Sequence, residues 1–211
     1  MKKYIEPNFR SSAMITIDTQ CDTLDGQPLE IPGTSAALPN IKMVLNAYRQ
    51  KTMPIVHMIR IYKKDGSNVD LCRREAVENG EEILLEGSSG CELASEMFNN
   101  SVNLDSGLLL SGKVQEISNN EVVIYKPRWG AFYNTPLEFH LNKLEIDTLV
   151  FAGCNFPNCP RTSIYEASER DFKVVLIEDA ISGSSPKGKE EMLNIGVQVT
   201  NAESIKKAII A

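Results

Sequence analysis

Apolar residues along the chain fall into two alternating patterns. Short runs rich in β-branched residues alternate with longer segments in which apolar positions recur every three or four residues. The first pattern predicts buried strands and the second predicts amphipathic helices. The expected strands are 13–18, 53–61, 121–126, 147–153, 173–180 and 197–200. The expected helices are 35–50, 135–144, 162–172, 186–196 and 203–210, with a short helix at 73–78.

The order of these elements predicts an α/β fold. Strands that are apolar throughout and alternate with amphipathic helices are typical of a parallel sheet covered on both faces. We therefore expect a three-layer α/β/α sandwich with a mainly parallel sheet of about six strands, in the order 3-2-1-4-5-6. No repeat, low-complexity tract or linker divides the sequence. Residues 1–211 are accordingly expected to form one domain.

Residues 63–120 interrupt the alternation of strands and helices. Their first half is polar and glycine-rich, and the segment is longer than an ordinary loop. It is too polar to form a second core. Long segments of this kind often cover active sites or make subunit contacts, so we expect one of these roles for residues 63–120.

Composition and charge restrict the partners of the protein. The chain has 211 residues, of which 42% are hydrophobic and 24% charged, as in an ordinary globular protein with a sizeable core. The net charge of −6 argues against nucleic acid and against an anionic membrane surface. No apolar run approaches the roughly 18 residues of a membrane span, and the start MKKYIEPNFR lacks the apolar region of a secretory signal. We expect a cytoplasmic protein that binds a small molecule.

Two of the five cysteines lie in the segment GCNFPNCPRTS, at Cys154 and Cys159. An odd, scattered set of cysteines is typical of reduced thiols in the cytoplasm and not of a disulfide framework. A structural zinc site needs four Cys or His ligands, usually as two close pairs. No second pair exists, and His57 and His140 fall on different predicted elements. We expect no metal and no cofactor.

Three residues with chemically useful side chains follow strands of the predicted sheet. The first strand ends at Asp18, the third at Lys126, and the fourth leads into Cys159. Ligands of open parallel sheets bind at the carboxyl ends of the strands. Each residue alone is more often a turn, surface or core residue, but an acid, an amine and a thiol at one sheet edge predict a functional site.

The position of Cys159 fits nucleophilic catalysis. A thiol attacks a carbonyl as its thiolate, and the start of a helix favours an anion through its unpaired N–H groups and dipole. Pro160 suits a first helical turn. Asp18 can take the thiol proton and later protonate a leaving nitrogen, with Lys126 adding a fixed positive charge. Backbone N–H groups of Cys159 and of the preceding loop can hold an oxyanion.

These motifs resemble the isochorismatase-like cysteine hydrolases, a superfamily that includes nicotinamidases, carbamoylsarcosine amidases and ureidoacrylate or biuret hydrolases. The resemblance covers nearly the whole chain and is carried by MITIDTQ, YKPRWGAFYNTPLEFHL and TLVFAGCNFPNCPRTSIYEASERDFKVVLIEDAISG. It implies an isochorismatase-like fold, a triad of Asp18, Lys126 and Cys159, and a thioester acyl-enzyme. It also implies a cis peptide bond between Cys154 and Asn155, with the N–H groups of Asn155 and Cys159 as oxyanion donors.

Departures from the family pattern restrict the substrate. Nicotinamidases carry Asp and His metal ligands after the second strand, whereas this chain reads RIYKKDG and has no histidine there. This argues against nicotinamide and against a metal. Isochorismatases proper lack the cysteine, so vinyl-ether hydrolysis is also disfavoured. Candidate substrate-binding residues are Gln20, Trp129, Phe132 and Asn158, and the arginines able to clamp a carboxylate are Arg60, Arg73, Arg74, Arg128 and Arg161.

Two functions follow from this reading. The first is cysteine-dependent hydrolysis of a C–N bond in a small amide, ureide or carbamoyl compound. The alternative is a non-catalytic or redox-regulatory protein in which Cys154 and Cys159 form a reversible disulfide. A redox pair does not require Asp18 and Lys126, so their presence favours the enzyme. We expect a homodimer or homotetramer.

Overall fold

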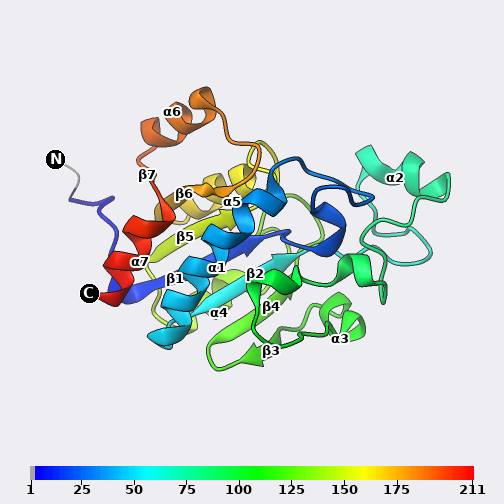
Figure 1. Ribbon diagram of the computed structural model, residues 1–211, viewed down its shortest axis with the longest axis horizontal. Helices are drawn as coiled ribbons and strands as arrows, with labels where there is room; N and C mark the ends of the chain where they lie inside the picture. The colour runs from blue at the N-terminus through cyan, green and yellow to red at the C-terminus, as the bar shows by residue number, and fades with distance from the viewer. Residues whose placement is uncertain (1–2) are drawn as a thin grey trace.

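The computed structural model describes residues 3–211 and contains one seven-stranded sheet (Figure 1). Neighbouring strands follow the order β3-β4-β2-β1-β5-β6-β7, and every pair is parallel except β3 with β4. The strands are β1 Ser12–Ile17, β2 Ile55–Ile59, β3 Gln115–Ser118, β4 Glu121–Tyr125, β5 Thr148–Gly153, β6 Lys173–Ile181 and β7 Gln198–Thr200.

The sheet confirms the expected architecture and adds one strand. The six predicted strands lie in the predicted order, and β3 extends the sheet at the edge beside β4. The residues of β3, QEIS, alternate between half-buried and exposed positions. They form no apolar run, because an antiparallel edge strand can face water on one side. The sequence pattern therefore gave no sign of this strand.

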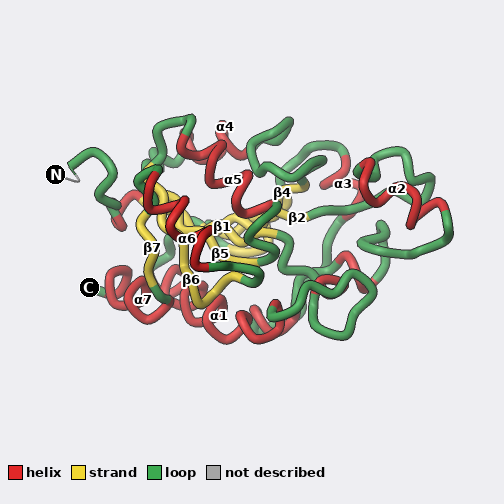
Figure 2. Tube along the Cα trace, turned by 90° about the horizontal axis from the view of Figure 1, so that it is seen from above, coloured by secondary structure: helices red, strands yellow, loops and turns green. Residues whose placement is uncertain are grey.

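Helices cover both faces of the sheet (Figure 2). On one face lie α1 Thr34–Gln50 and α7 Ala202–Ile210, which contact each other and β6. On the other face lie α4 Leu137–Lys143, α5 Cys159–Ser168 and α6 Pro186–Asn194. In the described residues no helix is both long and apolar enough to cross a membrane.

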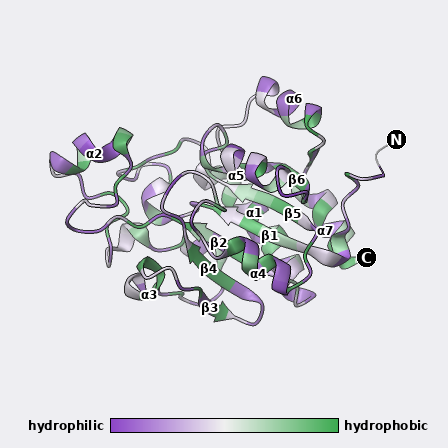
Figure 3. Ribbon diagram, turned by 180° about the vertical axis from the view of Figure 1, so that it is seen from behind, coloured by the Kyte–Doolittle hydropathy of each residue, from purple (hydrophilic) through white to green (hydrophobic). Residues whose placement is uncertain are grey.

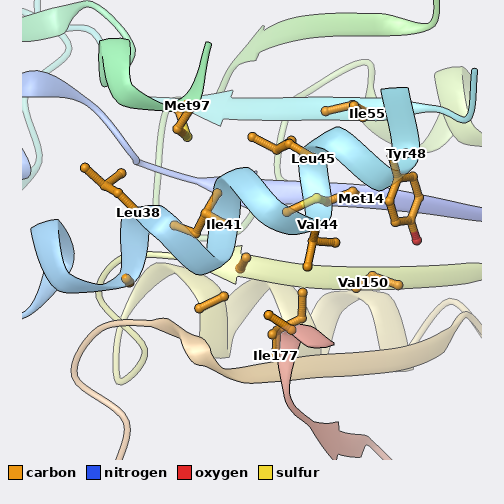
Figure 4. Close-up of a cluster of buried hydrophobic side chains, with 14 of the residues drawn as sticks. Met14, Leu38, Ile41, Val44, Leu45, Tyr48, Ile55, Met97, Val150 and Ile177 are labelled. Carbon is orange, nitrogen blue, oxygen red and sulfur yellow. The ribbon is translucent and has the colours of Figure 1, made fainter. Parts of the chain in front are cut away.

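Burial along β1 explains why its sequence is apolar throughout. Met14 packs against residues of α1 on one face, whereas Ile15 and Ile17 pack with residues of α4 and α5 on the other. All three side chains are fully buried. Figure 4 shows the α1 side of this core, where Leu38, Ile41, Val44, Leu45 and Tyr48 lie over Met14, Ile55, Val150 and Ile177. A strand buried on both faces has no polar side to alternate with.

The segment 63–120 contains α2 Leu71–Glu78, α3 Ser106–Leu110 and β3. The helix α2 has no buried residue and projects from the body of the molecule (Figure 1). Its surface is largely hydrophilic, in contrast to the central strands (Figure 3). A small apolar cluster of Tyr62, Val69, Ile83 and Leu84 anchors this part of the chain, with Val77 of α2 packed against it.

Candidate active site

Strand order brings the three predicted catalytic residues to one edge of the sheet. Asp18 follows β1 and donates its N–H to Met58 O at 2.9 Å. Lys126 follows β4 and donates its N–H to Ile59 O at 2.9 Å. Cys159 is the first residue of α5, which the short loop 154–158 connects to β5. Because β4, β2, β1 and β5 are consecutive in the sheet and parallel, all three residues lie at the same edge of the sheet, beyond the carboxyl ends of these strands.

Asp18 and Lys126 form a buried ion pair. Lys126 Nζ lies 2.8 Å from Asp18 Oδ2. Lys126 is fully buried and Asp18 is 7% exposed. Within the described residues, the second carboxylate oxygen, Oδ1, is buried and has no hydrogen-bond partner. One oxygen of Asp18 is therefore fixed by the lysine, and the other is available to accept a proton.

Cys159 is a buried thiol beside this carboxylate. Burial raises the pKa of Cys159 to about 12; the charge of Asp18 acts in the same direction, and the charge of Lys126 opposes it. Burial and the charge of Asp18 thus oppose the anion that the start of a helix favours. Formation of the thiolate requires transfer of the thiol proton, for which Asp18 is the adjacent acceptor.

The loop between β5 and α5 contains the expected cis peptide bond, between Cys154 and Asn155. Hydrogen bonds fix the loop: Phe156 N–H donates to Ser182 O at 2.8 Å, and Asn158 N–H donates to Asn155 O at 2.9 Å. In the described part of the chain, the N–H groups of Asn155 and Cys159 donate to no protein acceptor. Cys159 belongs to the first helical turn, where N–H groups lack intrahelical acceptors. Both donors are thus available to a ligand.

Close packing of β5 on β1 sets the position of Asp18. Gly153 has φ 121°, and a Cβ atom there would lie 2.3 Å from Ile17 O, so only glycine fits. Asp18 has φ 46°, and its carbonyl accepts hydrogen bonds from the Thr23 hydroxyl at 2.9 Å and the Cys154 thiol at 3.0 Å. Cys154 and Cys159 are both free thiols. A disulfide between them would remove the contact of Cys154 with Asp18.

A small pocket opens beside Cys159, with about 330 Å³ of space including its mouth. Its lining is Asp18, Thr23, Leu29, Ile31, Arg60, Arg73, Leu84, Trp129, Cys154, Asn155, Asn158 and Cys159. Two of the predicted substrate-binding residues, Trp129 and Asn158, are among them. Arg73 and Leu84 come from the segment 63–120, so this segment forms part of the pocket wall.

The other two predicted substrate-binding residues, Gln20 and Phe132, do not line this pocket. The side-chain amide of Gln20 accepts from Arg60 N–H at 2.9 Å and donates to the carbonyls of Arg60 and Cys91 at 2.8 and 2.6 Å. It holds the ends of two strands together. The Phe132 ring packs 5.8 Å from the Phe172 ring in the core on the α4 side of the sheet.

The sequence did not indicate that Arg60 and Arg73 line the same pocket as Cys159. Arg60 follows β2, the strand between those that carry Asp18 and Lys126. The rule that ligands bind at carboxyl ends of strands therefore also applies to Arg60. Arg73 lies on the projecting helix α2, and no pattern in its neighbourhood indicates that it reaches the site.

The residues at this sheet edge do not fit a divalent cation. Among residues 3–211, no three His, Cys, Asp or Glu side chains gather in a way that could hold a metal ion. Arg60 instead places a fixed positive charge in the pocket wall. A guanidinium disfavours a second cation nearby.

Comparison with known proteins agrees with the fold. The family profile described as Isochorismatase domain matches residues 12–204, and the chain belongs to the isochorismatase family. It is 27% identical over 198 residues to a probable inactive nicotinamidase of Arabidopsis thaliana, covering 90% of this chain and 92% of that one. It is 26% identical over 175 residues to an N-carbamoylsarcosine amidase of an Arthrobacter species, covering 82% of this chain and 60% of the relative.

Among solved structures, an isochorismatase family protein from Desulfovibrio vulgaris has the same fold, with a TM-score of 0.80 and 24% sequence identity. The match covers 95% of this chain and 99% of that one. The relatives include one named as an amidase and one named as probably inactive. Membership of the family therefore does not by itself decide whether this chain is catalytic.

Proposed function

We propose that the protein is a cysteine hydrolase that cleaves a C–N bond of a small amide, ureide or carbamoyl compound. One observation carries the proposal: Asp18 has one carboxylate oxygen bound to the buried Lys126 and the other unpartnered next to the Cys159 thiol. A purely structural ion pair would not require a buried nucleophile beside it. The similarity to an N-carbamoylsarcosine amidase supports the same reaction class.

In the first half-reaction, Asp18 Oδ1 accepts the thiol proton as Cys159 Sγ attacks the carbonyl carbon. The new S–C bond displaces the electron pair of the carbonyl double bond onto oxygen. The free N–H groups of Asn155 and Cys159 are the donors for this oxyanion. When the C–N bond breaks, Asp18 returns the proton to the nitrogen, which leaves as ammonia or an amine. The product of this half is a thioester on Cys159.

In the second half-reaction, the ionised Asp18 activates a water molecule. The water oxygen attacks the thioester carbon while its proton passes to Asp18. Cleavage of the C–S bond releases the acid, and the proton on Asp18 returns to the Cys159 sulfur. Lys126 holds Asp18 in one orientation throughout. Protons and electrons balance over the cycle without an oxidant or a reductant.

The pocket supports a small substrate. The 330 Å³ includes open solvent, and only about 20 Å³ is free cavity volume, far below the roughly 300–1,000 Å³ of typical ligand pockets. The indole of Trp129 supplies an apolar wall, and the side chain of Asn158 supplies a hydrogen-bonding group.

Ammonia release from a panel of small amides, ureides and carbamoyl compounds tests the proposal. We expect turnover of at least one member, and a loss of at least about 10³-fold in Cys159→Ser, since removing a nucleophile from a catalytic unit has effects of this size or larger. Cys154→Ser is the matched control, because it changes a buried thiol in the same loop and a hydroxyl can still donate to Asp18 O. Turnover that persists in Cys159→Ser would contradict the proposal.

A further inference from the structure

One edge of the Arg60 guanidinium is buried and has no partner. Nη1 donates to Asp70 and to Pro127 O. Nε and Nη2 have no hydrogen-bond partner in the described residues, although the residue is only 1% exposed. Buried N–H groups without acceptors are rare and cost free energy. Arg60 lines the same pocket as Cys159, so a ligand in that pocket can supply the missing acceptors.

The shape of this edge selects the acceptor. Nε and Nη2 present two parallel N–H groups, which match the two oxygens of a carboxylate. The guanidinium is held in place before any ligand arrives, because Asp70 binds Nη1 and the Gln20 amide binds the Arg60 backbone on both sides. Fixed donors of this kind give selectivity, since a ligand without the matching group leaves them unpaired.

Arg73 adds a second positive charge at the pocket. Its guanidinium lies 5.6 Å from the Trp129 ring centroid, and Nη1 donates to Tyr62 Oη at 3.0 Å. The side chain is 21% exposed, in contrast to the buried Arg60. Arg73 therefore stands nearer to solvent and comes from the projecting helix α2.

Basic side chains outnumber acidic ones in the pocket lining itself. The charged residues of the lining are the basic Arg60 and Arg73 and the acidic Asp18. A ligand with a negative charge therefore meets two guanidinium groups in the pocket wall.

We propose that the substrate carries a carboxylate, which the Nε–Nη2 edge of Arg60 binds in two-point fashion with Arg73 beside it. The amide or carbamoyl carbonyl of the same molecule then lies at Cys159. The substrate class is an N-carbamoyl or amide derivative of a small carboxylic acid. The reaction at Cys159 rests on the proposed function, but the binding of the carboxylate does not.

Equilibrium binding to the Cys159→Ser variant tests this inference without requiring turnover. Matched probes differ only in charge: N-carbamoylglycine against N-carbamoylglycinamide, and succinamate against succinamide, each titrated by calorimetry. We expect the carboxylate of at least one pair to bind at least tenfold more tightly than its neutral partner. The double variant Cys159→Ser/Arg60→Lys keeps the positive charge opposite Asp70 but lacks the paired Nε and Nη2 donors. We expect it to lose most of the preference for the carboxylate probe and to bind the neutral probe as before.

Arg73→Gln in the Cys159→Ser background provides a second measurement of the preference for the carboxylate probe. Arg73 is partly exposed, so this variant serves if Arg60→Lys fails to fold. Arg74→Gln is its matched control, because Arg74 lies on the same helix, is exposed and does not line the pocket. Equal affinity for charged and neutral probes, absence of binding by every probe, or equal losses in Arg73→Gln and Arg74→Gln would overturn the inference. Charge-selective binding together with no Cys159-dependent ammonia release would instead refute hydrolysis and leave the carboxylate site standing.

Discussion

Replacement of Asp18 by asparagine is expected to reduce hydrolysis and, at the same time, to make Cys159 more reactive toward alkylation. An amide cannot take the thiol proton, and loss of a general base lowers rates by about 10²–10⁴-fold. The negative charge of Asp18 raises the pKa of the thiol, so its removal lowers that pKa below about 12. Because the thiolate is the nucleophile, its fraction at a fixed pH well below the pKa rises about tenfold for each unit of decrease. Alkylation accelerates by about threefold per unit, since a less basic thiolate is a weaker nucleophile.

The two opposite effects distinguish a catalytic role of Asp18 from a structural one. Ammonia release measures the first effect, and mass spectrometry of the Cys159 peptide after iodoacetamide treatment between pH 7 and 10 measures the second. Peptide resolution is needed because Cys72 is exposed. Asp171→Asn, at an exposed position outside the pocket, is expected to change neither rate. Slower alkylation of Cys159 in Asp18→Asn would show that the carboxylate does not act on the thiol as described.

Replacement of Lys126 by methionine is expected to lower the free energy of unfolding by about 3–5 kcal/mol, because it leaves the buried Asp18 carboxylate without its partner. This is a large part of the roughly 5–15 kcal/mol that holds a domain folded. Urea denaturation measures the change. Lys189→Met is the matched control: Lys189 and Glu178 are 2.7 Å apart but 33% and 37% exposed, and such surface pairs contribute about 0–1 kcal/mol.

The double variant Asp18→Asn/Lys126→Met separates burial of charge from loss of packing. It removes both charges at once, so we expect it to be more stable than Lys126→Met alone. Equal losses in Lys126→Met and Lys189→Met would contradict the view that Asp18 and Lys126 form a strongly coupled buried pair.

The sequence was informative wherever a pattern extends over several residues. Six strands were predicted because short apolar runs rich in β-branched residues favour strands buried on both faces of a sheet. Asp18 and Lys126 were found because each ends such a run, and Cys159 because it lies in the loop and helix start that follow one. The strand β3 was missed because it is short, polar and half exposed. Edge strands of this kind resemble loops in sequence.

Properties that depend on depth and on distant contacts were not predictable in this way. The position of Cys159 at a helix start does not indicate that its thiol is buried or that Asp18 approaches it, and both of these tertiary features raise its pKa. Gln20 and Phe132 lie near site residues in sequence, but their side chains turn toward backbone groups and the core. Arg73 reaches the pocket from α2. In the sequence it lies more than 40 residues from each of Asp18, Lys126 and Cys159.

The central claim is that Cys159 forms a covalent acyl-enzyme, and its most direct test is rapid acid quenching during turnover followed by mass spectrometry. A compound that releases ammonia is mixed with the protein, and the peptide containing both Cys154 and Cys159 is fragmented to locate any added mass. Our account predicts an acyl group on Cys159 Sγ, and no such adduct in Asp18→Asn. An acyl group on Cys154, or turnover that is undiminished in Cys159→Ser, would contradict it.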